Sequence, residues 1–84
     1  MRLPRDLSGR ELIRLLNRYG YEQARQVGSH IRICSILRGY PHHVTVPDQS
    51  ELRLGTLNAI LSDVAQYLGL ERATLAEEIF AKRR

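Results

Sequence analysis

A Gly-Ser pair, Gly28–Ser29, separates two segments of extended character and narrows the possible folds more than any other feature of the sequence. Two residues between extended segments predict a tight β-hairpin with glycine at the position that needs a positive φ. The hairpin places His30 at the start of its second strand, exposed to solvent. A histidine there suits proton transfer, because an ordinary histidine pKa of about 6.5 allows both protonation states near neutrality.

Capping signals and hydrophobic periodicity predict the elements around the hairpin. Ser8 and Glu11 have the spacing of a capping box, which predicts a first helix that ends at Gly20. Alternation and β-branched residues predict three strands downstream of this helix. The predicted strands cover residues 21–27, 30–37 and 42–46.

Two further helices complete the predicted order. One follows Thr56, its expected N-cap, and ends at Gly69, and the other begins near Arg72. The order α-β-β-β-α-α predicts an α+β domain, in which a three-stranded antiparallel sheet has helices on one face. The 84 residues contain no repeat or linker, so we expect a single domain over residues 1–84 with its core at about 8–80.

The register of the hairpin determines which side chains share a face of the sheet. Around a Gly28–Ser29 turn, Val27 pairs with His30, and Arg25 lies opposite Arg32. Side chains of the second strand alternate between the two faces. The set that starts at Ile31 and continues with Ile33 is more apolar at the start of the strand than the set that starts at His30, so it is expected to face the helices. His30 and Arg32 then lie on the open face. Two arginines directly opposite each other repel, and a bound phosphate would relieve that repulsion.

The charge distribution indicates a polyanionic partner. Between Gln23 and Pro47 the chain has arginines and histidines but no Asp or Glu, although its net charge is only +4. Such a patch attracts polyanions. Twelve of the thirteen basic residues are arginine, whose planar group binds phosphate through two hydrogen bonds. A solvated basic face without a ligand has the same composition, so charge alone leaves both interpretations open.

The composition favours no other class of site. Cys34 is the only cysteine, so an internal disulfide is excluded, and its apolar neighbours predict an inert, buried thiol. The histidines lack metal-ligand spacing, and neither a metal nor another cofactor is expected. No segment has the length of a membrane span or the pattern of an export signal, which predicts a cytoplasmic protein without membrane contact.

Three motifs together resemble a known family. They are RQVGSH at residues 25–30, VTVP at residues 44–47 and LRLGTL at residues 52–57, with Ile60–Leu61 one turn further on. In this order and at these distances they are similar to the HicA toxins of toxin–antitoxin pairs. The resemblance implies a fold like that of double-stranded RNA-binding domains. It also implies a small endoribonuclease that cleaves mRNA and whose active site is covered by a HicB-type antitoxin.

The resemblance implies that His30, which ends the Gly-Ser-His motif, is the catalytic residue. RNA carries its own nucleophile, the 2′-hydroxyl, so a histidine general base can start cleavage without a metal. Arg25 and Arg32, with the backbone around Gly28 and Ser29, are expected to bind the RNA phosphate. The sequence does not identify the general acid.

Several roles stay open at this point. His43 is expected on the same side of the sheet as Thr45, where it either approaches the site or only covers the surface, and His42 is expected in a turn. A non-catalytic RNA-binding module of the same fold needs the arginines but not His30. A protein-interaction domain would use the same arginines for an acidic partner. Only the Gly-Ser-His motif favours the nuclease.

Overall fold

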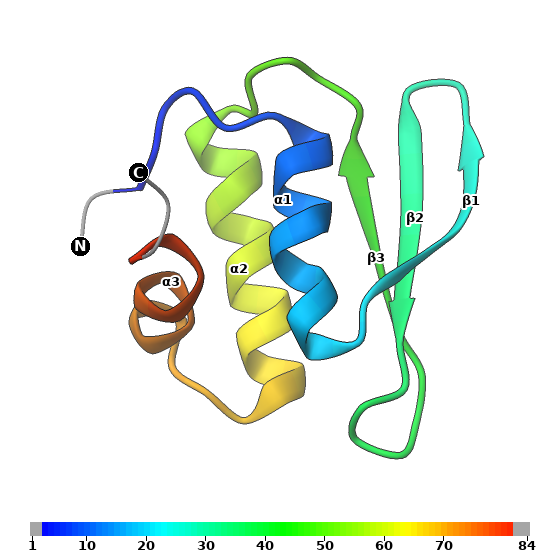
Figure 1. Ribbon diagram of the computed structural model, residues 1–84, viewed down its shortest axis with the longest axis vertical. Coiled ribbons are helices and arrows are strands. Elements are labelled where there is room, and N and C mark those ends of the chain that lie inside the picture. Colours follow the sequence, from blue (N-terminus) through cyan, green and yellow to red (C-terminus); the bar gives the residue numbers. More distant parts are fainter. Residues whose placement is uncertain (1–2, 82–84) are drawn as a thin grey trace.

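The computed structural model describes residues 3–81 and confirms the predicted α+β class and element order (Figure 1). Its strands form one antiparallel sheet in the order β1-β2-β3. They are β1 (Glu22–Val27), β2 (His30–Ser35) and β3 (His42–Pro47). The helices are α1 (Gly9–Leu16), which continues as a short 3-10 turn η1 (Asn17–Tyr19), α2 (Leu54–Leu68) and α3 (Arg72–Phe80).

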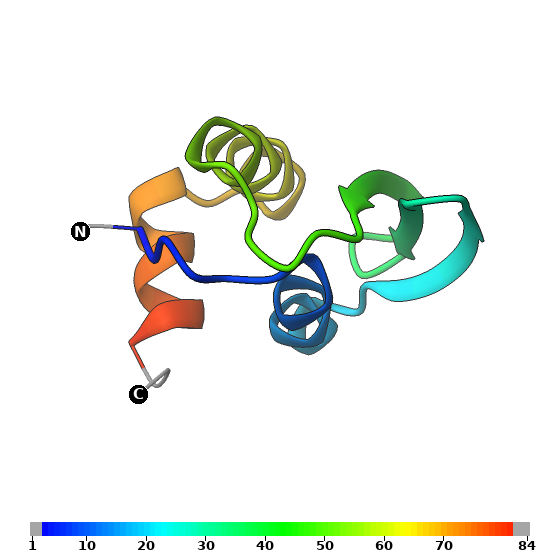
Figure 2. The same ribbon diagram turned by 90° about the horizontal axis from the view of Figure 1, so that it is seen from above.

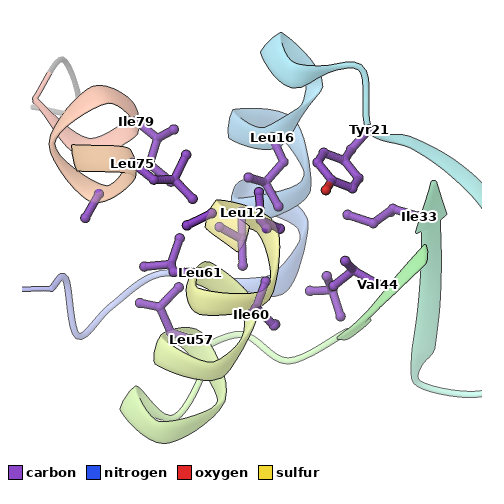
Figure 3. Close-up of a cluster of buried hydrophobic side chains, with 14 of the residues drawn as sticks. Leu12, Leu16, Tyr21, Ile33, Val44, Leu57, Ile60, Leu61, Leu75 and Ile79 are labelled. Carbon is purple, nitrogen blue, oxygen red and sulfur yellow. The ribbon is translucent and has the colours of Figure 1, made fainter. Parts of the chain in front are cut away.

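The helices cover one face of the sheet and leave the other face open (Figure 2). α1 and α2 pack against β3, and α3 packs against α2 on the side away from the sheet. The hydrophobic core fills the space between these layers (Figure 3). Its side chains come from all three helices and from the sheet, and include Leu12, Leu16, Ile33, Val44, Leu61 and Leu75.

Local signals in the sequence explain where α1 begins and ends. The Ser8 hydroxyl accepts a hydrogen bond from the Glu11 backbone N–H, and the Glu11 carboxylate accepts one from the Ser8 N–H, each at 3.0 Å. Gly20 follows η1 with a φ of +84° and ends the helical segment. Gly9 lets the start of α1 approach β3 closely, because a Cβ at Gly9 would overlap the Pro47 carbonyl.

The predicted start of α2 is wrong by three residues. The helix begins at Leu54, its N-cap is Arg53, and Thr56 lies within the first turn. Leu52 and Leu57 are both buried, and the Leu57 N–H donates to the Arg53 carbonyl at 2.9 Å. Tertiary packing of these two leucines therefore determines where the helix starts, and the capping preference of threonine does not.

β2 ends at Ser35, two residues before its predicted end. The buried Ser35 hydroxyl donates to the Tyr19 carbonyl at 2.8 Å and accepts from the Leu37 N–H at 3.1 Å. These bonds turn the chain out of the sheet, so Ile36 and Leu37 project into solvent. The strand ends because the Leu37 N–H bonds the Ser35 hydroxyl instead of a backbone carbonyl of a neighbouring strand. The β-branched composition of the segment does not reveal this side-chain hydrogen bond.

β1 is an edge strand that the helices do not cover. All six of its residues are exposed, and within residues 3–81 no other strand pairs with its outer edge. Its pairing with β2 shifts by one residue between Gln23 and Arg25, which marks a β-bulge. Beyond the bulge, the register continues to the β1–β2 turn without interruption.

Candidate functional site

The turn between β1 and β2 has the predicted geometry. Gly28 has a φ of +58° and Ser29 an ordinary negative φ, as in a II′ turn with glycine at its first central position. Val27 pairs with His30, and Arg25 lies opposite Arg32. The register expected from a two-residue turn is therefore confirmed.

Side chains of all three strands surround a shallow hollow on the open face, next to this turn. It has a volume of about 130 Å³ and is lined by Arg25, Val27, His30, Arg32 and Thr45. All five residues are exposed. Because Arg32 pairs with Arg25 on one side and with Thr45 on the other, two guanidinium groups and a hydroxyl share one row across the sheet. His30 lies in the adjacent row.

The hollow brings three of the predicted site residues together and leaves two outside. His30, Arg25 and Arg32 line it, whereas Gly28 and Ser29 form the tip of the hairpin beside it. Sequence reasoning omitted Val27 and Thr45 from the site. The signal for Thr45 was the period-two alternation of β3, which places it on the open face across from Arg32.

Electrostatics and access favour an anionic ligand in this hollow. No carboxylate lines it, and its two arginines lie directly opposite each other. Within the part of the chain that the structure describes, no other side chain hydrogen-bonds the exposed His30 imidazole. The imidazole is thus accessible to a ligand that enters the hollow.

His43 lies on the open face, but away from the hollow. It pairs with Cys34, and its Nε2 is 4.0 Å from the Cys34 Sγ. It lies four positions before Pro47, the partner of His30, which corresponds to about 13 Å along a strand. His43 does not line the hollow, although Thr45, which does, is two positions away on the same strand. Cys34 is half-buried, so the prediction of a buried thiol is wrong: alternation places it on the open face, whereas its neighbour Ile33 faces the core.

His42 has a structural role: the predicted turn position is wrong, whereas the predicted strand over residues 42–46 includes this residue correctly. It is the first residue of β3, and its ring stacks on Tyr67 with centroids 4.7 Å apart. Its Nδ1 is 2.6 Å from the Tyr21 hydroxyl, and its Nε2 is 3.1 Å from Asp63 Oδ1. Burial raises the pKa of Tyr21 well above its ordinary value, so its hydroxyl remains protonated.

The described residues contain no group of three or more His, Cys, Asp and Glu side chains that could hold a metal ion. Over the same part of the chain, no helix is long and apolar enough to cross a membrane. Both observations concern residues 3–81 only.

Comparison with known proteins identifies the family. A family model described as the HicA toxin of bacterial toxin–antitoxin systems matches residues 9–66. The match spans α1, the whole sheet and most of α2, and it includes every residue that lines the hollow. No curated protein and no solved structure matches the chain. Because the family model covers more than half of the sequence, the chain belongs to the HicA toxin family.

Proposed function

We propose that this toxin–antitoxin component acts as an endoribonuclease that cleaves mRNA with His30 as the general base. The observation that carries the proposal is the shared hollow: an exposed imidazole, which no side chain among residues 3–81 hydrogen-bonds, lies beside two opposed arginines. An imidazole next to a phosphate-binding pair is the minimum that RNA cleavage needs, because the substrate supplies the nucleophile.

In the proposed reaction, Arg25 and Arg32 hold the phosphate and His30 removes the proton of the neighbouring 2′-hydroxyl. The 2′-oxygen attacks phosphorus, and the negative charge that develops on the phosphate oxygens is stabilised by both guanidinium groups. The P–O5′ bond then breaks, and the 5′-oxygen leaves with a proton from water. The products are a 2′,3′-cyclic phosphate and a 5′-hydroxyl. Thr45 has a hydroxyl in the row of the arginines and is placed to donate to the same phosphate.

The partner proposed for this site is a HicB-type antitoxin. Family membership implies a cognate antitoxin. No helix of the described residues covers the open face of the sheet, and this face carries His30 and both arginines. An antitoxin that covers this face with acidic side chains would block the imidazole and neutralise the arginines. An enzyme that acts on mRNA in this way works in the cytoplasm.

We expect cleavage to persist in excess EDTA, and single-stranded DNA of matching sequence to be bound but not cut. The first result follows because no step uses a metal, and the second because DNA lacks the 2′-hydroxyl. The measurement is the appearance of 2′,3′-cyclic phosphate ends from RNA incubated with the purified protein, with and without EDTA. Dependence on a divalent metal, or cleavage of DNA, would refute the mechanism. RNA that is bound but never cut would instead favour the non-catalytic RNA-binding module.

We expect Arg25→Ala and Arg32→Ala each to weaken RNA binding to a similar degree for different sequences. Phosphate contacts carry no sequence information. Affinity for a single strand falls as salt rises, and each lost phosphate contact makes the plot of log affinity against log salt concentration shallower by about 0.7. The measurement is RNA affinity at several salt concentrations. Arg72→Ala, an exposed arginine of α3 on the far side of the helices, is the matched control and should keep the original slope. Unchanged slopes in both test variants would place the RNA elsewhere.

A further inference from the structure

Three side chains from separate elements meet on the helix-facing side of the hairpin, behind the hollow. They are Arg10 of α1, Gln26 of β1 and Asp48, which directly follows β3. Arg10 Nε and Nη2 donate to Asp48 Oδ1 and Oδ2 at 3.1 and 3.0 Å. Gln26 joins this ion pair, because its Oε1 accepts from Arg10 Nη2 and its Nε2 donates to Asp48 Oδ2, both at 3.4 Å. We call Arg10, Gln26 and Asp48 the turn cluster.

The turn cluster holds both carbonyl groups of the β1–β2 turn. Gln26 Nε2 donates to the Gly28 carbonyl at 3.0 Å, and the Asp48 backbone N–H donates to the Ser29 carbonyl at 2.7 Å. His30 is the next residue after these two. These hydrogen bonds fix the backbone directly before His30 from the helix-facing side of the sheet. The His30 ring lies on the opposite, open face.

The contact between α1 and the end of β3 keeps Arg10 in place. The Gly9 N–H donates to the Gln49 carbonyl at 2.9 Å, and the missing side chain of Gly9 lets the helix meet the Pro47 carbonyl. This puts the first turn of α1 against the residues that flank Asp48. Arg10 thus connects the helical layer to β1, the strand whose residues are all exposed.

The charge of Asp48 is balanced within the turn cluster. Its hydrogen bonds with Arg10 hold the pKa of this carboxyl below its ordinary value, so it stays ionised where histidines ordinarily titrate. The ion pair is therefore formed throughout the pH range in which His30 would act. An ionised Asp48 without Arg10 would put an uncompensated negative charge next to a site that binds phosphate.

We propose that Arg10, Gln26 and Asp48 are positioning residues that fix the Gly28–Ser29 turn and thereby orient His30 toward the phosphate held by Arg25 and Arg32. The proposal rests on the function assigned to His30 above. None of the three residues touches the RNA in this arrangement. They act through the backbone of the turn, so their loss lowers kcat more than it raises KM, because a misplaced base slows the chemical step without removing the phosphate contacts.

The test compares Gln26→Ala, Asp48→Asn and Arg10→Ala with two matched controls. Gln23→Ala removes an exposed glutamine from the same strand, and Arg14→Ala removes an exposed arginine one turn further along α1. For each variant, kcat and KM for RNA cleavage, the melting temperature and the hydrogen exchange of the Asp48 backbone amide are measured.

We expect the three test variants to lower kcat by about 10- to 100-fold and to accelerate exchange of the Asp48 amide, with melting temperatures near that of the original protein. Gln26→Ala and Asp48→Asn should leave KM within about twofold. Arg10→Ala should also raise KM, because Asp48 is left unpaired, and adding Asp48→Asn to it should restore KM but not kcat. The controls should behave as the original protein.

Two results would overturn the proposal. One is unchanged exchange of the Asp48 amide in all three variants, because the turn would then not depend on the cluster. The other is faster exchange with kcat unchanged, because the orientation of His30 would then not depend on the turn. The exchange measurement needs no catalysis. If the original protein does not cleave RNA at all, the nuclease proposal fails by itself, and exchange still decides whether the cluster holds the turn.

Discussion

Replacement of His30 by alanine will lower the rate of RNA cleavage by about 10²- to 10⁴-fold, the usual contribution of a general base, and will abolish toxicity. The fold and RNA binding will be retained. His30 is exposed and its ring forms no hydrogen bond with other described residues, so the substitution should change the free energy of unfolding by no more than about 0.5 kcal/mol. Single-turnover cleavage and thermal unfolding of the purified variant measure the two effects.

His43→Ala is the matched control for this experiment. It removes the same type of side chain from the same open face, outside the hollow. Cleavage at the original rate is expected, because His43 does not line the hollow. Full activity in a folded His30→Ala variant would remove His30 from the mechanism. A comparable loss of activity in His43→Ala would return that residue to the site and supply a candidate for the general acid.

The largest effect on stability is expected for Leu12→Ala, which will lower the free energy of unfolding by about 2–5 kcal/mol. Leu12 is completely buried on α1, where α1, α2 and the sheet meet (Figure 3). Truncation removes buried apolar surface and leaves a cavity that the rigid surroundings fill only in part. Since a domain of this length is stable by only about 4–13 kcal/mol, the variant should be partly unfolded in mild denaturant.

Urea denaturation followed by circular dichroism measures this loss. Leu54→Ala provides the matched control, because it deletes the same atoms from the exposed first residue of α2. It should lower the free energy of unfolding by less than about 1 kcal/mol. Equal effects of the two substitutions would show that the junction of α1, α2 and the sheet contributes less to stability than its burial indicates.

Interactions that are local in sequence made the hairpin and α1 predictable. A two-residue turn fixes the pairing of its flanking strands, so the Gly28–Ser29 turn was sufficient to place Arg25 opposite Arg32. The capping box of Ser8 and Glu11 spans only three residues and is likewise visible in the sequence. The arrangement of residues at the centre of the candidate site is therefore predictable from the sequence.

The errors concern residues whose environment comes from distant parts of the chain. His42 is anchored by Tyr21 and Asp63, each 21 residues away, and nothing beside it in the sequence reveals these partners. The predicted burial of Cys34 rests on its apolar sequence neighbours, but neighbouring residues of a strand point to opposite faces of the sheet. The bond between Arg10 and Asp48 joins positions 38 residues apart and depends on the close approach of α1 to β3.

The bulge in β1 has a consequence for the behaviour of the protein at high concentration. An uncovered edge strand presents a row of unpaired N–H and C=O groups, which invites strands of other molecules to add to the sheet and so begins aggregation. The register shift between Gln23 and Arg25 breaks the regular spacing of that row. Arg25 and Glu22 add charges that an incoming strand would have to desolvate. β1, the strand that carries Arg25, is in this way protected against pairing with the same strand of another copy.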